Sequence, residues 1–233
     1  MEQQIQFGTR VIPFTIHYAD RKSLGLQVHP DSSVHAIAPL NTPVADVLKK
    51  VRLKAGWILK QQDYFASFLP LTPARKYVNG ETHLYLGRQY KLRKVISDET
   101  QVKLYRGQME VHAAQDTTET IEGVLHDWYK AKAREVFEGL LADVIYRTPR
   151  FQGKRLNLHV KTMQTRWGSC SPAGRITLNT ELIKAPKACI EYVVIHELCH
   201  LIHPSHNKKF YRLLSTLMPD WEKWKDRLER SMA

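Results

Sequence analysis

Hydrophobic and polar positions alternate with a period of two along the first forty residues, which is typical of β-strands with one buried face. Strands are expected at Val11–His17, Leu24–His29 and Ser33–Ala38, with turns at Asp20–Lys22 and Pro30-Asp31 between them. Short strands that follow one another through such tight turns predict an antiparallel meander.

Apolar residues then recur at helical spacing between Thr42-Pro43 and about Tyr64, and this pattern predicts a single helix with one buried face. Asn79-Gly80 is typical of a tight hairpin turn. The strands expected to follow it are Thr82–Leu86, Gln89–Val95 and Val102–Tyr105. The N-terminal part is therefore expected to be rich in antiparallel β-structure, with one helix.

The pattern changes near Asp116. The segment Asp116–Glu119 resembles a capping box, and the apolar stripe after it predicts a long helix to about Arg147. Two strands, Leu156–Met163 and Arg175–Leu182, are expected next, joined by a glycine-rich hairpin loop, and three further helices complete the chain. We expect an α+β protein of two domains, residues 1–115 and 116–233.

The first of these three helices begins after Pro186 and carries the segment His196-Glu197-Leu198-Cys199-His200. Residues four apart share one face of a helix, so His196 and His200 can direct two imidazoles at one point. Glu197 lies beside them, within reach of a water molecule held there. This H-E-x-x-H pattern is typical of zinc hydrolases.

A catalytic zinc ion has three protein ligands and one open position. Pro204 ends the helix, so the chain can turn back and bring His206 to the site. His203 competes for the same role because it lies three residues after His200, but it comes before the turn. The spacing favours His206 as the third ligand, and His203 would then face the substrate or stabilise the helix end.

Zinc in such a site lowers the pKa of its bound water from 15.7 to about 7, and Glu197 would act as the general base. Zinc is the expected cofactor, although another divalent metal fits the same ligands. Arg166 is a further catalytic candidate, because it borders the loop before the metal helix and could bind a substrate anion or an oxyanion. The alternative is an arginine that only holds the loop.

The composition is that of an ordinary globular protein, with 43% hydrophobic and 25% charged residues. The sequence shows neither an apolar run of membrane-spanning length nor a secretory pattern at its start, and its three cysteines lack a CxxC spacing. These features predict a cytoplasmic protein with reduced thiols and no membrane partner. They do not predict an oligomeric state.

The chain carries a formal net charge of +12, and residues 150–233 hold 15 Lys and Arg against 7 Asp and Glu. This excess favours an anionic partner, such as a nucleotide or an acidic peptide, and leaves nucleic acid open. Lys208, Lys209 and Arg212 flank His206 and could form a basic rim around the site. The alternative is that each is solvated surface.

Further motifs accompany the metal helix in both halves of the chain. They are Thr165–Cys170, Leu178-Asn179, Pro186, Tyr192–Ile195, His206–Phe210, and, nearer the N-terminus, Tyr77–Glu81, Leu84–Gly87 and Tyr90. Together with the H-E-x-x-H helix, they resemble the YgjP-like metallopeptidase family, formerly a domain of unknown function. The resemblance implies a zincin-like catalytic domain in residues 116–233, related to SprT-like and WLM-type proteases, and metal-dependent hydrolysis.

Three functions remain open. A metallopeptidase is favoured by the motif and by an edge strand that could pair with an extended substrate. A nucleoside triphosphate pyrophosphatase, or another phosphoanhydride hydrolase, is favoured by the positive charge. A non-catalytic nucleic-acid-binding zinc protein is disfavoured, because a structural zinc site has no need of a base such as Glu197.

Overall fold

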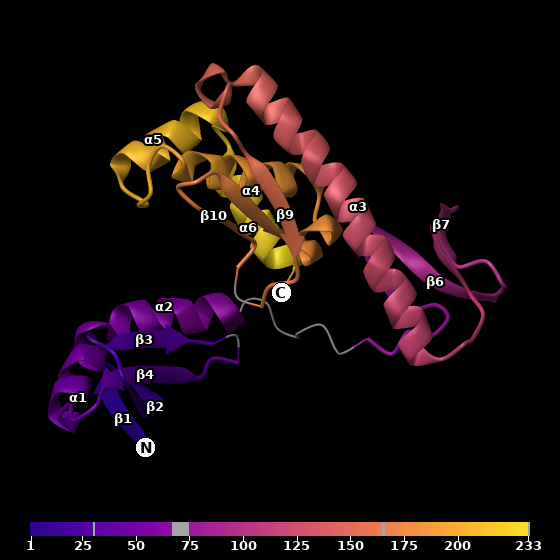
Figure 1. Ribbon diagram of the computed structural model, residues 1–233. Helices are drawn as coiled ribbons and strands as arrows, with labels where there is room; N and C mark the ends of the chain where they lie inside the picture. The colour runs from indigo at the N-terminus through magenta and orange to yellow at the C-terminus, as the bar shows by residue number, and fades with distance from the viewer. Residues whose placement is uncertain (30, 67–74, 165, 233) are drawn as a thin grey trace. The chain divides into compact units, whose positions relative to one another are not determined.

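A computed structural model describes residues 1–29, 31–66, 75–164 and 166–232. Across these residues the chain is α+β, with six α-helices and three mixed sheets. It divides into two compact units, residues 1–72 and residues 73–232 (Figure 1). The boundary expected at Asp116 falls inside the second unit, between strand β8 (Gln108–Ala113) and helix α3 (Thr118–Arg147), which pack against each other.

The first unit is a four-stranded sheet with the order β1-β2-β4-β3. Its strands are β1 (Glu2–Phe7), β2 (Arg10–Ala19), β3 (Gly25–Val28) and β4 (Val34–Pro39). The expected antiparallel meander is wrong, because β2 and β4 pair in parallel and β3 lies at the edge. Strand β1 was not expected, since Ile5 is its one buried residue. Pro30, in one of the expected turns, lies outside the described residues.

The single helix expected after this sheet is two helices, α1 (Val44–Leu53) and α2 (Ala55–Ala66). The break at Lys54 is small, because its N–H donates to Lys50 O and its own carbonyl accepts from Ile58 N–H. The apolar face continues across the break, and Val47, Val51 and Ile58 all pack into the core of this unit. The sequence pattern therefore identified the buried face but not the interruption.

The second unit begins with a sheet of order β5-β6-β8-β7. Strands β5 (Thr82–Tyr85), β6 (Arg88–Ile96) and β7 (Gln101–Tyr105) were expected, whereas β8 was not, and β8 pairs in parallel with β6. The turn of the first hairpin is Leu86-Gly87, both with positive φ. Asn79-Gly80, the expected hairpin turn, precedes β5 instead.

Helix α3 ends at Arg147, as expected, and begins one residue later than the expected capping box at Asp116–Glu119 places it. Its cap is Thr117, whose hydroxyl accepts a hydrogen bond from Thr120 N–H, and its last residue is Arg147. The helix packs against β7 and β8 and also against β9 (Asn157–Lys161) of the next sheet (Figure 1). One hydrophobic core thus includes side chains from both sheets of the second unit.

The last sheet has the order β10-β11-β9, with β10 at Gly168–Cys170 and β11 at Arg175–Asn179. Strands β10 and β11 form an antiparallel hairpin, whereas β9 pairs in parallel with β11. The two expected strands therefore do not form a hairpin with each other. Strand β10 lies at one edge of the sheet and β9 at the other, and β10 packs against helix α4 (Lys187–His200).

The short 3-10 helix η2 (Thr180–Lys184) connects β11 to α4. The three helices expected at the end of the chain are α4, α5 (Lys208–Leu217) and α6 (Trp221–Ser231). In the described part of the chain, none of the helices has the length and apolar character needed to cross a membrane.

Candidate metal centre

The start of helix α4 is held by the hairpin of β5 and β6. At the tip of this hairpin, Gly87 N–H donates to Lys184 O over 2.9 Å. A Cβ atom on Gly87 would lie 2.8 Å from Pro186 Cγ, and Gly87 has a φ of +77°. Only glycine allows this close packing with positive φ. The Leu84–Gly87 motif therefore helps to fix the beginning of the metal-site helix.

His196 and His200 project from α4, and His206 lies in the segment before α5. One ring nitrogen of each histidine lies within 4.8 Å of those of the other two, so the group could hold a metal ion. The Nε2 atoms of His196 and His206 are 3.0 Å apart. His203 does not belong to this group and instead lines a pocket near the start of α5.

Two side chains of the following segment position the third imidazole. Asn207 caps α5, because its Oδ1 accepts hydrogen bonds from Lys209 N–H and Phe210 N–H, each over 3.0 Å. The ring of Phe210 is fully buried and contacts all three imidazoles, with centroid separations of 4.7 to 5.0 Å. The capped helix and its phenylalanine thus support His206 from behind.

The environment of His196 and His206 favours their neutral forms. Burial, together with the neighbouring His200 and His206, lowers the pKa of His196 to about 3. Burial and His200 also lower the pKa of His206. A neutral imidazole offers the lone pair that a metal ion needs, and a set of three nitrogen donors fits zinc or a similar divalent ion.

Glu197 is the buried carboxyl group of this site, with a relative exposure of 6%. Burial raises its pKa from 4.5 to about 7, and the positive charge of Arg166 partly opposes this shift. In the described part of the chain, no hydrogen bond or ion pair engages its carboxylate. The group can therefore exchange a proton near neutral pH, which suits a general base.

Strand β10 lies directly against Glu197. A Cβ atom on Gly168 would lie 2.7 Å from Glu197 Oε1 and 2.8 Å from its Cγ, closer than real Cβ contacts occur. Cys170, on the same strand, is also near, because burial and then the charge of Glu197 raise the pKa of its thiol to about 11. Glycine at position 168 is thus a steric requirement for the position of Glu197.

Arg166 lies in the loop before β10, and its side chain is exposed. The loop is held by Asn179, which is 3% exposed and whose side-chain amide donates to Met163 O over 2.8 Å and to Arg166 O over 3.1 Å. The structure therefore brings Arg166 close enough to act electrostatically on Glu197. Thr165, the first residue of the motif at this loop, lies outside the described residues.

Gly168, Asn179 and Phe210 were not identified as functional from their residue types. Each belongs to a motif of the family resemblance, and that was the one signal in the sequence that could have identified them. Their roles depend on contacts with Glu197, with the Arg166 loop and with the imidazoles. These contacts join segments that are separated along the chain.

One relative in sequence aligns with part of this chain. The UTP pyrophosphatase of Escherichia coli (strain K12) is 32% identical over 66 residues, which are 28% of this chain and 40% of that protein. The chain thus aligns with less than half of that relative's length.

Two solved structures are similar to part of the chain. The metallopeptidase zymogen abylysin of Pyrococcus abyssi is 20% identical, with a TM-score of 0.34 over 43% of this chain and 94% of that one. The metallopeptidase zymogen jannalysin of Methanocaldococcus jannaschii is 16% identical, with a TM-score of 0.37 over 42% of this chain and 90% of that one.

Residues 22–231 match the sequence pattern of one protein family, the YgjP-like metallopeptidase domain. This range includes the hairpin of β5 and β6, helix α3 and all three histidines of the candidate site. The resemblance inferred from the sequence motifs is confirmed, and the chain belongs to the YgjP-like metallopeptidase family.

Proposed function

We propose that this protein is a zinc-dependent hydrolase in which His196, His200 and His206 hold the ion and Glu197 is the general base. The convergence of the three ring nitrogens within 4.8 Å is the observation that carries the proposal. When bound, the ion supplies Lewis acidity, which allows water to lose a proton near neutral pH. Glu197 takes that proton and later donates it to the leaving group.

The protein positions Glu197 before any substrate arrives. Its carboxyl group is buried, the edge strand β10 packs against it at Gly168, and its pKa of about 7 suits both acceptance and donation of a proton. The positive charge of Arg166 acts on this carboxyl group and opposes the effect of burial on its pKa. We assign it to a substrate anion or to negative charge that develops on an oxygen in the transition state.

We assign peptide-bond hydrolysis as the reaction. Strand β10 is the edge of its sheet and lies against Glu197, so an extended peptide can pair with β10 and present its carbonyl group at the site. Helix α3, the sheet of β9 to β11 and helix α4 follow one another in the order expected of a zincin-like core. Membership of a metallopeptidase domain family supports the same reaction.

Hydrolysis of a phosphoanhydride is the second candidate. The positive charge of residues 150–233 and the partial similarity to a UTP pyrophosphatase favour it. A metal-activated water can attack phosphorus as well as a carbonyl carbon, so the same four residues serve both reactions.

The test uses zinc-loaded protein with a peptide library and, separately, with a panel of nucleoside triphosphates. Glu197→Gln should retain stoichiometric zinc and lose hydrolysis by about 10²- to 10⁴-fold, because the ligands remain while the base is removed. Full activity of the metal-loaded variant would exclude the mechanism. Cleavage of nucleotides but not of peptides would select the second reaction.

A further inference from the structure

A pocket of about 470 Å³ lies between the end of α3 and one face of α5. Its walls include the aliphatic side chains of Leu213 and Leu217, and none of its lining residues is acidic. The residues used below are Arg147, Thr148, Arg150, His203, Lys209 and Arg212, and we call them the basic pocket. They come from two segments, residues 147–150 and 203–212, that are distant in the sequence, so the charges are gathered by the fold.

Most of the positive charge in the basic pocket is not neutralised. Arg147 forms an ion pair with Glu191. In the described part of the chain, no carboxylate lies within ion-pair distance of the side chains of Arg150, Lys209 or Arg212. Like charges that converge on one hollow repel one another, so the arrangement is more favourable when an anion occupies it.

Thr148 supplies a neutral donor at the same place. The residue is 7% exposed and lines the pocket, and no hydrogen bond to its hydroxyl is found among the described residues. This hydroxyl is therefore free to donate a hydrogen bond to an oxygen anion in the pocket.

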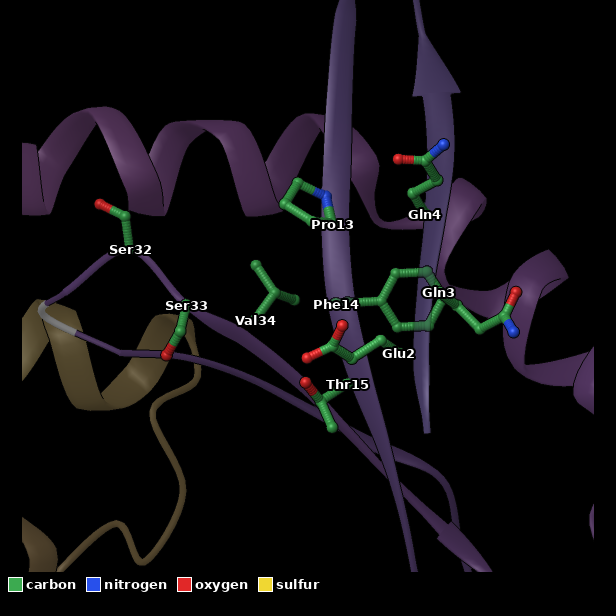
Figure 2. Close-up of a pocket in the computed structure, with 9 residues that line it drawn as sticks. All are labelled: Glu2, Gln3, Gln4, Pro13, Phe14, Thr15, Ser32, Ser33 and Val34. Atoms are coloured by element: carbon green, nitrogen blue, oxygen red, sulfur yellow. The ribbon is translucent and has the colours of Figure 1, made fainter.

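A second pocket of the protein provides a contrast. It lies on the sheet of the first unit, has a volume of about 530 Å³, and is drawn in Figure 2. Glu2 is the one charged residue among the nine that line it, and the others are polar or apolar. Size alone therefore does not distinguish the basic pocket, whereas its charge does.

We propose that the basic pocket is a binding site for a small molecule that carries linked phosphate groups. A single phosphate group has a charge of about −1.5 to −2 at neutral pH, so three unpaired cations match two linked phosphates better than one. A concave pocket with aliphatic walls fits a compact ligand, whereas a nucleic acid backbone needs an extended basic surface.

The basic pocket is distinct from the metal centre but adjoins the segment that carries the third imidazole. His203 lies between His200 and His206 along the chain and lines the pocket. Lys209 follows the cap residue Asn207, which fixes the start of α5. Ligand binding does not require the metal ion, so the proposal can be tested in metal-free protein.

The test measures binding of inorganic pyrophosphate to the full-length, metal-free protein by titration calorimetry. Lys209→Glu and Arg212→Glu should each weaken binding by about tenfold or more, because each replaces a charge-assisted hydrogen bond with repulsion. Lys208→Glu is the matched control, since Lys208 is exposed on the same helix, does not line the pocket and changes the net charge equally. It should weaken binding only by the about two- to threefold expected of a screened distant charge.

Two further variants keep the result interpretable. Thr148→Val replaces the hydroxyl by a methyl group and leaves the charges unchanged, and it should weaken pyrophosphate binding. It therefore tests the pocket even if the charge-reversal variants do not fold. His196→Ala should bind pyrophosphate as well as the wild type does, whereas it should lose hydrolysis if the proposed function is correct. The two proposals can therefore fail independently.

Several outcomes would overturn the basic pocket as a phosphate site. They are no pyrophosphate binding by the wild type, equal weakening by Lys208→Glu and Lys209→Glu, or loss of binding in His196→Ala. If citrate binds as tightly as pyrophosphate, the pocket is a site for polyanions in general and not for phosphate groups. If a single-stranded oligonucleotide binds and its affinity depends equally on Lys208 and Lys209, the surface is an extended nucleic-acid site instead.

Discussion

Each unit of this protein contains a group of three neighbouring histidines. They are His17, His29 and His35 in the first unit and His196, His200 and His206 in the second. Ring centroids are 4.6 and 4.9 Å apart in the first group and 4.6 to 5.1 Å apart in the second. In the described residues, only the second group brings three ring nitrogens within 4.8 Å of one another. Crowded imidazoles are therefore not sufficient for a metal site.

The difference follows from the secondary structure that carries the rings. His17 on β2 and His35 on β4 belong to neighbouring parallel strands, whose side chains stand side by side on one face of the sheet. Their rings accordingly stack, with an angle of 23° between the ring planes. On α4, His196 and His200 are four residues apart, and the chain returns with His206, so the nitrogens converge.

The two groups also differ in the carboxyl group beside them. Near the first group, Asp31 is exposed, and hydrogen bonds from Ser33 lower its pKa. Next to the second group, Glu197 is buried and its pKa is raised to about 7. Only the second group therefore combines converging ligands with a base that is active near neutral pH.

The largest expected effect concerns metal binding. His206→Ala should weaken zinc binding by about 100-fold or more, because it removes a ligand, and loss of a residue that only supports a ligand already costs about 10- to 100-fold. His203→Ala and His35→Ala should each change the affinity little, and the wild type should bind one ion per chain. Chelator competition measures all three. If the wild type binds a second ion per chain and His35→Ala does not, the first group of histidines also binds metal, and the distinction between the two groups is wrong.

The next effect concerns the pH dependence of stability in metal-free protein. The folded state binds the proton of Glu197 more tightly than the unfolded chain does. The contribution of this proton to the free energy of unfolding is therefore fully present below pH 4.5 and is lost as the pH rises towards 7. Glu197→Gln should be as stable as the wild type near pH 4.5 and more stable above pH 7, by at most about 3 kcal/mol. Denaturant titrations across this range measure the difference.

Asp31 provides the opposite case for that experiment. The pKa of Asp31 is lowered in the folded state. The contribution of its ionised carboxylate to the free energy of unfolding is therefore present at higher pH and is lost as the pH falls through the acidic range. The difference between the wild type and Asp31→Asn should therefore have the opposite sign. Differences of the same sign for both substitutions would contradict the contrast between the two carboxyl groups.

The smallest expected effect concerns the fit of Glu197 against β10. Gly168→Ala should lower kcat by about tenfold and leave zinc affinity unchanged, because the added methyl group displaces the carboxylate but none of the three imidazoles. Gly139→Ala is the control, since a Cβ atom there meets nothing within 4 Å. It should leave kcat unchanged and stabilise α3 slightly. A Gly168→Ala enzyme with normal kcat would show that Glu197 tolerates the shift.

The sequence by itself determined the features that are encoded within one segment. The capping-box pattern at Asp116–Glu119 and the apolar stripe after it locate α3, although the cap residue is Thr117 rather than Asp116, and Pro186 marks the start of α4. The four-residue spacing of His196 and His200 predicts their shared direction because a helix has a fixed period. The order of motifs along the chain was also sufficient to identify the family.

Only the tertiary structure decided which segments meet. An alternating strand pattern is the same for parallel and antiparallel neighbours, so the parallel pairings of β2 with β4 and of β9 with β11 could not be read from it. The contact between Gly168 and Glu197 depends on the packing of β10 against α4, and the charges of the basic pocket are gathered where the end of α3 meets α5. These are interactions between residues distant in the sequence, and their energies depend on distance in space, which a local pattern does not contain.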